Sequence, residues 1–372
     1  MKILITGGAG FIGSHIVDAV AEKHEVVVLD NLEPQVHTSG GPEYLNENAT
    51  YLFGDVRDKA VLRRALEGAE VVFHEAAAVG VGQSMYRVEK YVEVNTMGTA
   101  KLLDVLVNEE HEVKKLIVAS SMSIYGEGAY ECSDCGMVYP NLRAEEQLQR
   151  GEWEMQCPTC GKIVKPIPTS EHKPLHSTSI YASTKRDQEE MCLSIGRAYG
   201  IPTVALRYFN VYGPRQSLNN PYTGVCAIFS ARIKNNNPPV IFEDGLQSRD
   251  FISVHDIVEA NILAMERSSA DYEVFNVGTG KAVSILEVAK ALMRWYNKDK
   301  GVEPEITNNY RAGDIRHCFA DISRIKNKLG YEPKVAFEEG LKELVAWGEK
   351  EEAMDKFDMA HEELKTKGLV GR

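Results

Sequence analysis

An apolar run at residues 2–6 (KILIT) leads directly into the glycine-rich sequence GGAGFIG at residues 7–13, and a helical pattern follows. Gly7, Gly10 and Gly13 set the spacing G-x-x-G-x-x-G. Glycines at these positions permit a tight turn and a close backbone approach to a pyrophosphate, which then faces the helix N-terminus. The sequence therefore predicts a dinucleotide-binding turn whose contacts include Phe11 and Ile12. Taken alone, the motif could also be an ordinary glycine-rich turn.

Short runs rich in Val, Ile and Leu alternate with amphipathic stretches through the first 208 residues. The further strand-like runs are 26–30, 71–74, 115–119 and 203–208, and the helical stretches include 13–23, 97–108 and 188–199. Such alternation predicts an α/β fold, a Rossmann-type doubly wound parallel sheet with helices on both faces. Turn residues become denser beyond about residue 209, which predicts a smaller C-terminal α+β part.

One stretch interrupts the alternation between a strand and the next helix. Residues 128–170 contain two cysteine pairs and four prolines, so we interpret them as an inserted module. The predicted organisation is a dinucleotide-binding domain (1–127 and 171–208, with part of 240–265), the insertion (128–170), a substrate-binding domain (209–239 and 266–345) and a helical tail (346–372).

The chain of 372 residues carries a formal net charge of −12. This charge argues against non-specific nucleic-acid binding, because no basic stripe interrupts it. No apolar run approaches the roughly 20 residues that cross a bilayer, so we expect no membrane association and a cytoplasmic location.

The second apolar run ends at Asp30, about 20 residues beyond the glycines, where a carboxylate can accept hydrogen bonds from ribose hydroxyls. The same charge repels a 2′-phosphate. Asn31 follows Asp30 in place of an arginine, so the sequence favours NAD over NADP.

Two further sites follow predicted strands. Asp55, with Val56, could contact the adenine amino group, or Asp55 could cap a helix that begins near Lys59. The small residues Ala76, Ala77 and Ala78 would let a cofactor pass close to the backbone, or they simply pack at a helix start.

Tyr181 and Lys185 are four residues apart, hence on one face of a helix. A tyrosine with a pKa of about 10 is a poor base at neutral pH, but a neighbouring lysine cation and a positive nicotinamide ring stabilise the phenolate. Such pairs also arise by chance on surface helices. Ser120–Ser123 follow a predicted strand that would place hydroxyl groups in the same crevice, so the context favours a catalytic pair.

Together, GGAGFIG, the LD that ends the second strand, SSMSIYG, YxxxK and YFNVYGPRQ resemble the extended short-chain dehydrogenase/reductases that act on nucleotide sugars. The resemblance covers roughly residues 1–345 apart from the insertion. It implies tightly bound NAD, a nucleotide-sugar substrate, a homodimer, and cofactor contacts from Tyr208 and Asn95. Asn95 would orient the catalytic loop, or it is a polar residue inside a helix with a backbone partner.

Members of this family first oxidise the sugar at carbon four, with the tyrosine taking the hydroxyl proton. Relatives that resemble 4,6-dehydratases then use acidic residues in the loop after the strand. Here the matching residues are Ser121, Met122 and Ser123, so elimination lacks its proton shuttle.

The sequence predicts 4-epimerisation, in which the hydride returns to the other face of the sugar. Ser121 would bind the substrate oxygen and Ser123 would assist, although Ser121 could merely cap a strand. The alternatives are a 4,6-dehydratase or decarboxylase, or an NAD(P)H-dependent 4-keto-sugar reductase.

The resemblance also implies a set of substrate residues in the second half. Asn210 matches the family asparagine that binds the sugar diphosphate, and Arg249 and Arg311 match the two phosphate-binding arginines. Each arginine could equally form a surface ion pair with its neighbour Asp250 or Asp314. The expected substrate contacts are Ser121, Asn210, Gly224, Val225, Arg249, Arg311 and Asp314.

The insertion contains Cys132, Cys135, Cys157 and Cys160 as two C-x-x-C-G knuckles. This spacing is typical of a four-cysteine zinc ribbon, in which the metal has no open position and is structural. A redox dithiol pair is the alternative. The ribbon together with SSMSIYG and the loop 220–225 resembles the dTDP-L-rhamnose 4-epimerase group. Because the insertion joins the two catalytic segments, we expect it near the mouth of the substrate pocket.

Overall fold

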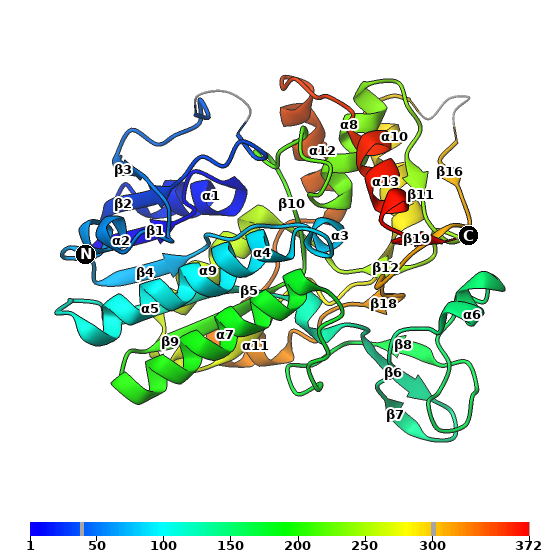
Figure 1. The fold of residues 1–372 in the computed structure, drawn as a ribbon, viewed down its shortest axis with the longest axis horizontal. Coiled ribbons are helices and arrows are strands. Elements are labelled where there is room, and N and C mark those ends of the chain that lie inside the picture. The colour runs from blue at the N-terminus through cyan, green and yellow to red at the C-terminus, as the bar shows by residue number, and fades with distance from the viewer. Residues whose placement is uncertain (38–40, 299–302, 372) are drawn as a thin grey trace.

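The computed structural model describes residues 1–37, 41–298 and 303–371, and its main element is a parallel sheet (Figure 1). The strand order is β3–β2–β1–β4–β5–β9–β14. The chain first adds β2 and β3 on one side of β1, and it then crosses over to add β4 and the later strands on the other side, so the order reverses between β1 and β4. A crevice at the carboxyl ends of strands forms at such a reversal. The strand bounds are β1 Lys2–Thr6, β2 Glu25–Asp30, β3 Ala49–Phe53, β4 Val71–His74, β5 Lys115–Ser121, β9 Thr203–Tyr208 and β14 Val274–Val277.

Helices cover both faces of the sheet, and the alternation of side chains along each strand decides which core a residue joins. Ile3 and Ile5 pack against one layer, whereas Leu4 packs against the other. The first layer contains α1 (Phe11–Val20), α9 (Val254–Glu266) and α11 (Ser323–Leu329), and the second contains α2 (Lys59–Leu66), α5 (Gly98–Asn108) and α7 (Ile180–Tyr199). The predicted doubly wound α/β fold is confirmed.

A third core is formed by elements that lie beyond β9 in the sequence. Helices α8 (Val225–Lys234), α10 (Ile285–Trp295) and α12 (Phe337–Gly348) pack there with β10 (Asn210–Tyr212), β11 (Val240–Ile241) and β13 (Phe251–Ser253). The remaining short strands are β12 (Ser248–Arg249), β15 (Val283–Ser284), β16 (Glu305–Ile306), β17 (Tyr310–Arg311), β18 (His317–Cys318) and β19 (Val370–Gly371). None of the helices in the described ranges is long and apolar enough to cross a membrane.

The structure differs from the predicted organisation in two places. Strand β14 lies within 266–345, assigned by sequence to the substrate side, yet it pairs in parallel with β9 at the edge of the main sheet. In the described part of the tail (346–371), α12 ends at Gly348, one further helix, α13 (Phe357–Thr366), follows, and β19 then pairs with β17. Both strands are too short for a period-two pattern to identify them from sequence.

The inserted stretch forms a small antiparallel sheet with its own core. The sheet consists of β6 (Ala129–Cys132), β7 (Gly136–Val138) and β8 (Lys165–Ile167), and a short helix, α6 (Glu145–Gln149), follows β7. It lies at the lower right of Figure 1, beside β18. The amide of Gly128 donates to the carbonyl of His317 (2.9 Å), so the module begins against the C-terminal half.

Candidate active site

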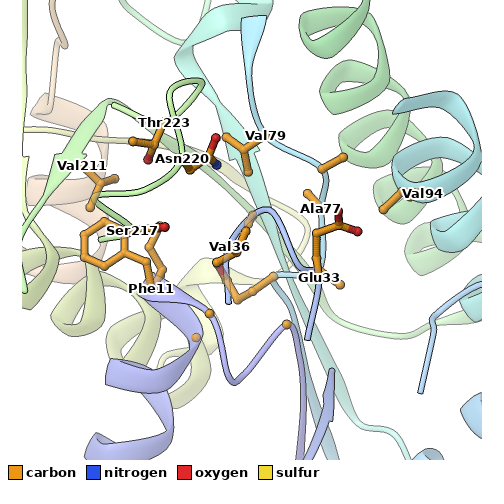
Figure 2. Close-up of a pocket in the computed structure, with 18 of the residues that line it drawn as sticks. Phe11, Glu33, Val36, Ala77, Val79, Val94, Val211, Ser217, Asn220 and Thr223 are labelled. Atoms are coloured by element: carbon orange, nitrogen blue, oxygen red, sulfur yellow. The ribbon is translucent and has the colours of Figure 1, made fainter. Parts of the chain in front are cut away.

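A cavity of about 370 Å³ opens at the reversal of the sheet. Figure 2 shows Phe11 and Val211 on one side of it and Ala77 and Val94 on the other. Most residues expected in the site line this cavity: Gly7, Gly10, Phe11, Ile12, Gly13, Asp30, Asn31, Asp55, Val56, Ala76, Ala77, Ala78, Ser121, Tyr181, Lys185, Tyr208, Asn210, Gly224 and Val225. Within the described ranges, five expected residues lie outside the lining, namely Asn95, Ser123, Arg249, Arg311 and Asp314.

The glycine-rich turn needs glycine for two different reasons. Gly7 has φ +72°, and a Cβ there would lie 2.8 Å from the amide nitrogen of Ala76. A Cβ on Gly13 would lie 2.3 Å from the carbonyl oxygen of Gly7. Gly10 is the N-cap of α1 and, having no side chain, makes no cap hydrogen bond to the amides of the first turn. This geometry suits an anion placed at that terminus.

The carboxylate of Asp30 is anchored at the end of β2. Its Oδ2 accepts from the amide of Ala9 (3.0 Å), and its Oδ1 accepts from the amide of Leu32 (2.8 Å). The carboxylate therefore joins the glycine-rich turn to the loop after β2 and presents negative charge to the cavity.

Asp55 does not cap the following helix. Asp58 is the cap of α2 and accepts from the amide of Ala60 (2.8 Å). The Asp55 carboxylate instead accepts from Asn31 Nδ2 (3.0 Å) and from the amide of Arg57 (2.8 Å). Hydrogen bonds from the Arg57 side chain lower the pKa of Asp55 to about 2, so the group is ionised where it lines the cavity.

Helix α7 places Tyr181 in the lining of the cavity. The helix begins at Ser179, whose side chain accepts from the amide of Ala182 (3.1 Å), and the amide of Tyr181 donates to Ser84 Oγ (3.0 Å). Burial raises the pKa of Tyr181 to about 12, while a hydrogen bond with Ser121 opposes that shift. The phenol is thus protonated at neutral pH unless a cation approaches it.

Lys185 lies one helical turn beyond Tyr181 and is buried. Its ammonium group donates to the carbonyl of Ala119 (2.9 Å), which fixes it against β5. Burial lowers the pKa of Lys185 to about 8, and the charge of Glu75 opposes that shift. The lysine therefore remains mostly cationic at neutral pH.

In the serine loop after β5, Ser121 both faces the cavity and caps the turn that follows the strand. Ser121 lines the cavity, and its Oγ also accepts from the amide (3.1 Å) and the hydroxyl (2.9 Å) of Ser123. Ser123 therefore lies behind Ser121 and supports it.

Asn95 belongs to a π-helical turn (Val92–Met97) and is completely buried. It accepts from the amide of Ala78 (2.7 Å), and its Nδ2 donates to the carbonyl of Ala78 (3.1 Å) and to Thr184 Oγ1 (3.0 Å). It ties the Ala76–Ala78 loop to α7 from outside the cavity.

Glu75 lines the cavity but was missed by the sequence interpretation. Its carboxylate accepts from the hydroxyl of Tyr208 (2.9 Å), and that hydroxyl is also hydrogen-bonded to Asn261. Burial raises the pKa of Glu75 to about 7. The available signal was its position directly after the buried strand β4, since polar residues at carboxyl ends of parallel strands face the crevice.

The two arginines expected at the substrate diphosphate make other contacts. Arg249 donates to the carbonyl oxygens of Ile315 (2.7 Å), Arg316 (2.9 Å) and Ser248 (2.8 Å), and not to Asp250. Arg311 donates to Asp314 (2.8 Å), which is the local ion pair considered from sequence.

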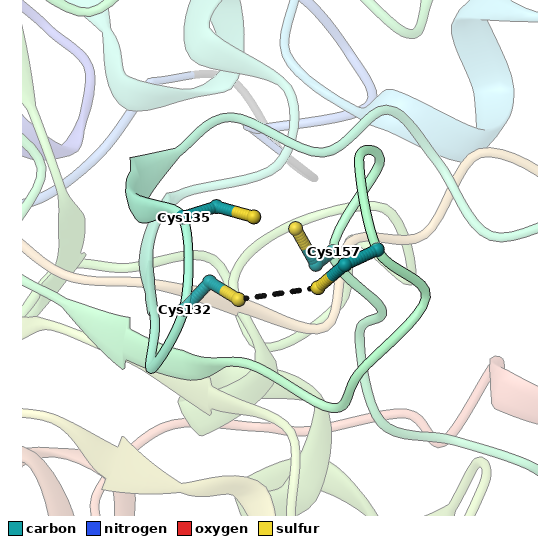
Figure 3. A group of neighbouring side chains, drawn as sticks. Cys132, Cys135 and Cys157 are labelled. Atoms are coloured by element: carbon teal, nitrogen blue, oxygen red, sulfur yellow. Dashed lines mark hydrogen bonds between the residues drawn. The ribbon is translucent and has the colours of Figure 1, made fainter.

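The four cysteines of the insertion come together (Figure 3). Their sulfur atoms all lie within 4.8 Å of one another, and the sulfurs of Cys132 and Cys160 are 3.5 Å apart without a disulfide bond. Gly136 and Gly161, which follow the second cysteine of each pair, both have φ +73°. Four thiols on two left-handed knuckle turns fit a tetrahedral metal ion. The module does not lie at the cavity mouth as expected, because no described residue of 128–170 belongs to the cavity lining.

Comparison with known proteins extends over nearly the whole chain. Residues 3–142 match the NAD dependent epimerase/dehydratase family model, and residues 161–344 match the model for GDP-mannose 4,6 dehydratase. A dTDP-L-rhamnose 4-epimerase of Burkholderia thailandensis is 36% identical over 93% of this chain and 94% of that protein. A putative UDP-glucose 4-epimerase of Methanocaldococcus jannaschii is 32% identical over 93% and 97%.

Among solved structures, the UDP-glucose 4-epimerase of Thermotoga maritima with UDP-glucose superposes with a TM-score of 0.76 at 36% identity. The superposition covers 94% of this chain and 99% of that one. The parallel sheet, the glycine-rich turn and the Tyr181–Lys185 helix all lie within these matched regions. The chain therefore belongs to the NAD-dependent epimerase/dehydratase family of extended short-chain dehydrogenase/reductases.

Proposed function

We propose that the protein is a nucleotide-sugar 4-epimerase with resident NAD, and that dTDP-L-rhamnose or another dTDP- or UDP-hexose is its substrate. The observation that carries this proposal is the loop after β5, where Ser121, Met122 and Ser123 provide no acid beside Tyr181. Without an acid there, a 4-keto sugar has no proton donor for elimination in this loop. The named 4-epimerases among the relatives support the same reaction.

The proposed chemistry begins with Tyr181 as the base for the hydroxyl at carbon four. NAD, when bound, supplies the hydride acceptor and later the hydride donor. Lys185 stabilises the phenolate through its cation, and Ser121 hydrogen-bonds the same substrate oxygen. Tyr181 then returns the proton after the sugar has turned over. Glu75 and Tyr208 form another part of the cavity wall and are hydrogen-bonded to each other.

For cofactor binding, we propose that the glycine-rich turn and α1 bind the pyrophosphate. Asp30 and Asn31 bind the adenosine ribose, and Asp55 and Val56 contact the adenine. Phe11, Ile12, Ala76, Ala77, Ala78 and Tyr208 complete the cofactor contacts, while Asn95 positions the loop that contains the three alanines.

Substituting Asp30 by Asn tests the proposed preference for NAD. Asn keeps an acceptor for a backbone amide but removes the charge that faces a 2′-phosphate. Like charges in contact cost several kcal/mol, so the affinity for NADP relative to NAD should rise at least about tenfold in this variant. Fluorescence titration with both cofactors measures the ratio. Asp58→Asn, which keeps the cap of α2, should leave it unchanged, and equal ratios in both variants would contradict the assignment.

On the substrate side, we propose that Asn210, Gly224 and Val225 contact the nucleotide sugar from the cavity wall. We further propose that residues 209–239 and most of 266–345 form the substrate-binding domain. We propose that Arg249 and Arg311 contact the diphosphate beyond the lining of this cavity, and that Asp314 holds Arg311 through their ion pair.

Glu75 favours a second candidate, a 4,6-dehydratase. It is a carboxyl in the cavity with a pKa raised to about 7, as a proton-transfer group requires. Its contact with Tyr208 on β9 and its place at the end of β4 set it apart from the β5 loop. A 4-keto product that disappears in Glu75→Gln would support this candidate.

Purified protein incubated with a panel of nucleotide sugars, without added NAD, tests the proposed function. We expect one pair of 4-epimers to reach equilibrium with no net change in nicotinamide absorbance. Accumulation of a 4-keto sugar, release of carbon dioxide or consumption of NAD(P)H would support a lyase or a reductase and contradict the proposal.

We also propose that the four cysteines bind one structural zinc ion. The protein should contain one zinc per chain by elemental mass spectrometry, and Cys157→Ser should lose it, because three thiolates leave the tetrahedron incomplete. Cys226→Ser, in the third core, is the matched control and should keep it. Metal-free protein with an intact set of thiols, or with a disulfide, would contradict the zinc site.

We further propose a cytoplasmic homodimer that associates through the helices around Tyr181. Apolar side chains are exposed beside α7 on α3 (Val81–Ser84), α4 (Val88–Tyr91) and the following turn, namely Val81, Met85, Val88, Val92 and Met97. A dimer interface would remove this apolar surface from water. Light scattering of the eluted protein measures the mass.

A further inference from the structure

The inserted module is attached to one segment of the C-terminal half, Asp314–His317. Glu127, directly before the insertion, accepts from the amides of Arg316 (2.7 Å) and His317 (2.8 Å). These bonds fix the backbone of the segment and not only its side chains.

A buried network of charges reinforces this attachment. Arg143, from the insertion, forms two hydrogen bonds with Glu243 (2.8 and 2.9 Å) and also donates to the carbonyl of Asp314 (3.3 Å). The guanidinium of Arg316 is completely buried and contacts Glu243 (2.9 Å) and Glu154 (2.6 Å), the latter again from the insertion. The side chains of Arg143, Glu243 and Arg316 are at most 3% exposed, whereas Glu154 is partly exposed. Moving one of the three buried charges would leave its partner unpaired, so they favour one geometry.

The same segment also contacts the two expected substrate arginines. Arg249 donates to the carbonyls of Ile315 and Arg316, and Arg311 is paired with Asp314 at the start of the segment. The network and these arginines therefore share one stretch of backbone. A shift of that stretch moves both guanidinium groups.

The cysteine cluster lies close to the charged network along the chain. Tyr130, two residues before Cys132, donates its hydroxyl to Glu127 (2.5 Å), and Glu154 precedes Cys157 by three residues. The buried core of the module is small, and two of its six residues are cysteines: Tyr130, Cys132, Val138, Met155, Cys157 and Val164. A core of this size needs a metal to become ordered.

We propose that the ribbon, when it holds its metal ion, keeps residues 311–317 in position, and that Arg143 is the main positioning residue. By holding this segment, the ribbon sets the affinity for the substrate diphosphate. The last step rests on the proposed function, since it assigns the diphosphate to Arg249 and Arg311. The ribbon acts from outside the cavity and takes no part in the hydride or proton steps.

Hydrogen exchange of the full-length protein, with and without a zinc chelator, tests the positioning directly. We expect faster exchange in the peptide that covers 311–318 after metal removal, because the amides of Arg316 and His317 lose their fixed acceptor. The peptide that covers β1 and α1 should exchange at an unchanged rate. Unchanged protection of 311–318 after verified metal loss would overturn the proposal.

Arg143→Met supplies the test by kinetics and binding. We expect KM for the nucleotide sugar to rise about tenfold while kcat stays within about twofold and bound NAD is retained, because uniform binding is lost rather than transition-state stabilisation. Arg143→Lys should recover only part of the affinity, since lysine cannot bind Glu243 through two nitrogens. Arg150→Met is the control, because this exposed arginine has Glu152, also in the module, as its one ion-pair partner among the described residues.

The outcomes separate the two proposals. If metal removal frees 311–318 but no nucleotide sugar binds or reacts in the wild type, the proposed function fails and the positioning stands. If the wild type epimerises a nucleotide sugar but Arg143→Met matches Arg150→Met in KM and in exchange, the positioning fails. Equal losses of kcat, bound NAD and thermal stability in Arg143→Met and Arg143→Lys would show that Arg143 stabilises the fold as a whole and does not position residues 311–317.

Discussion

Replacing Tyr181 by Phe should lower kcat roughly a hundredfold to ten-thousandfold, the range expected when a positioned acid–base group is lost. The substitution removes only the hydroxyl that Ser121 contacts, and the ring keeps its edge-to-face packing with Tyr91 (centroids 6.4 Å apart). Bound NAD and the unfolding midpoint should therefore change little. Initial rates with the substrate found in the panel give the measurement.

The dependence of the reaction rate on pH tests the role of Tyr181 more directly. In the unliganded structure, burial raises the pKa of Tyr181 to about 12, so the phenol is protonated, and it needs the Lys185 cation and a positive nicotinamide to ionise near neutrality. The wild-type rate should rise with pH as Tyr181 loses its proton in the complex. Tyr181→Phe should lack that rise. A variant with near wild-type activity and the same pH profile would exclude Tyr181 as the base.

Replacing Arg207 by Met should lower the free energy of unfolding by about 3–5 kcal/mol, the cost of leaving a buried charge without its partner. Arg207 on β9 forms two hydrogen bonds with Glu189 on α7 (2.5 and 3.0 Å), and it also donates to the hydroxyl of Tyr125 (2.8 Å). Both side chains are at most 5% exposed, so solvent cannot replace the lost contact. Without Arg207, the Glu189 carboxylate keeps only the hydroxyl of Ser120 among its described side-chain partners.

Arg294→Met is the matched control for this effect. Arg294 pairs with Glu338 at 2.8 Å, but both side chains are about half exposed, and such pairs contribute about 0–1 kcal/mol. Urea unfolding of both variants gives the comparison. Equal small changes would mean that the Arg207–Glu189 pair does not stabilise the attachment of the catalytic helix to the sheet.

The main sheet was predictable because its strands are buried on both faces and read as continuous Val/Ile/Leu runs. Strand β5, for example, is buried at all seven positions. The glycine-rich turn was predictable for a similar reason, since backbone contacts of 2.3 to 2.8 Å would exclude any side chain at Gly7 and Gly13. Strand β14 was not predictable, because its four residues at the sheet edge form a pattern too short to be distinguished from the turns around them.

The sequence could not predict which side chains that are distant along the chain contact one another. Asp55 and Asp58 are both plausible helix caps by position, and only the fold shows that Asp58 is the cap. Glu75 faces the cavity because β4 ends there. Arg249 and the insertion meet at Ile315 and Arg316 only through tertiary contacts, so neither the place of the ribbon nor its buried charge network could be predicted from cysteine spacing.

The central claim is that the hydride taken from carbon four returns to the same sugar. A nucleotide sugar labelled with deuterium at carbon four, incubated with the purified protein in ordinary water without added NAD, tests it directly. The account predicts that the 4-epimer keeps the deuterium at carbon four, as read by nuclear magnetic resonance and mass spectrometry. Loss of the label to solvent, or its appearance at another carbon of a 4-keto sugar, would contradict the account.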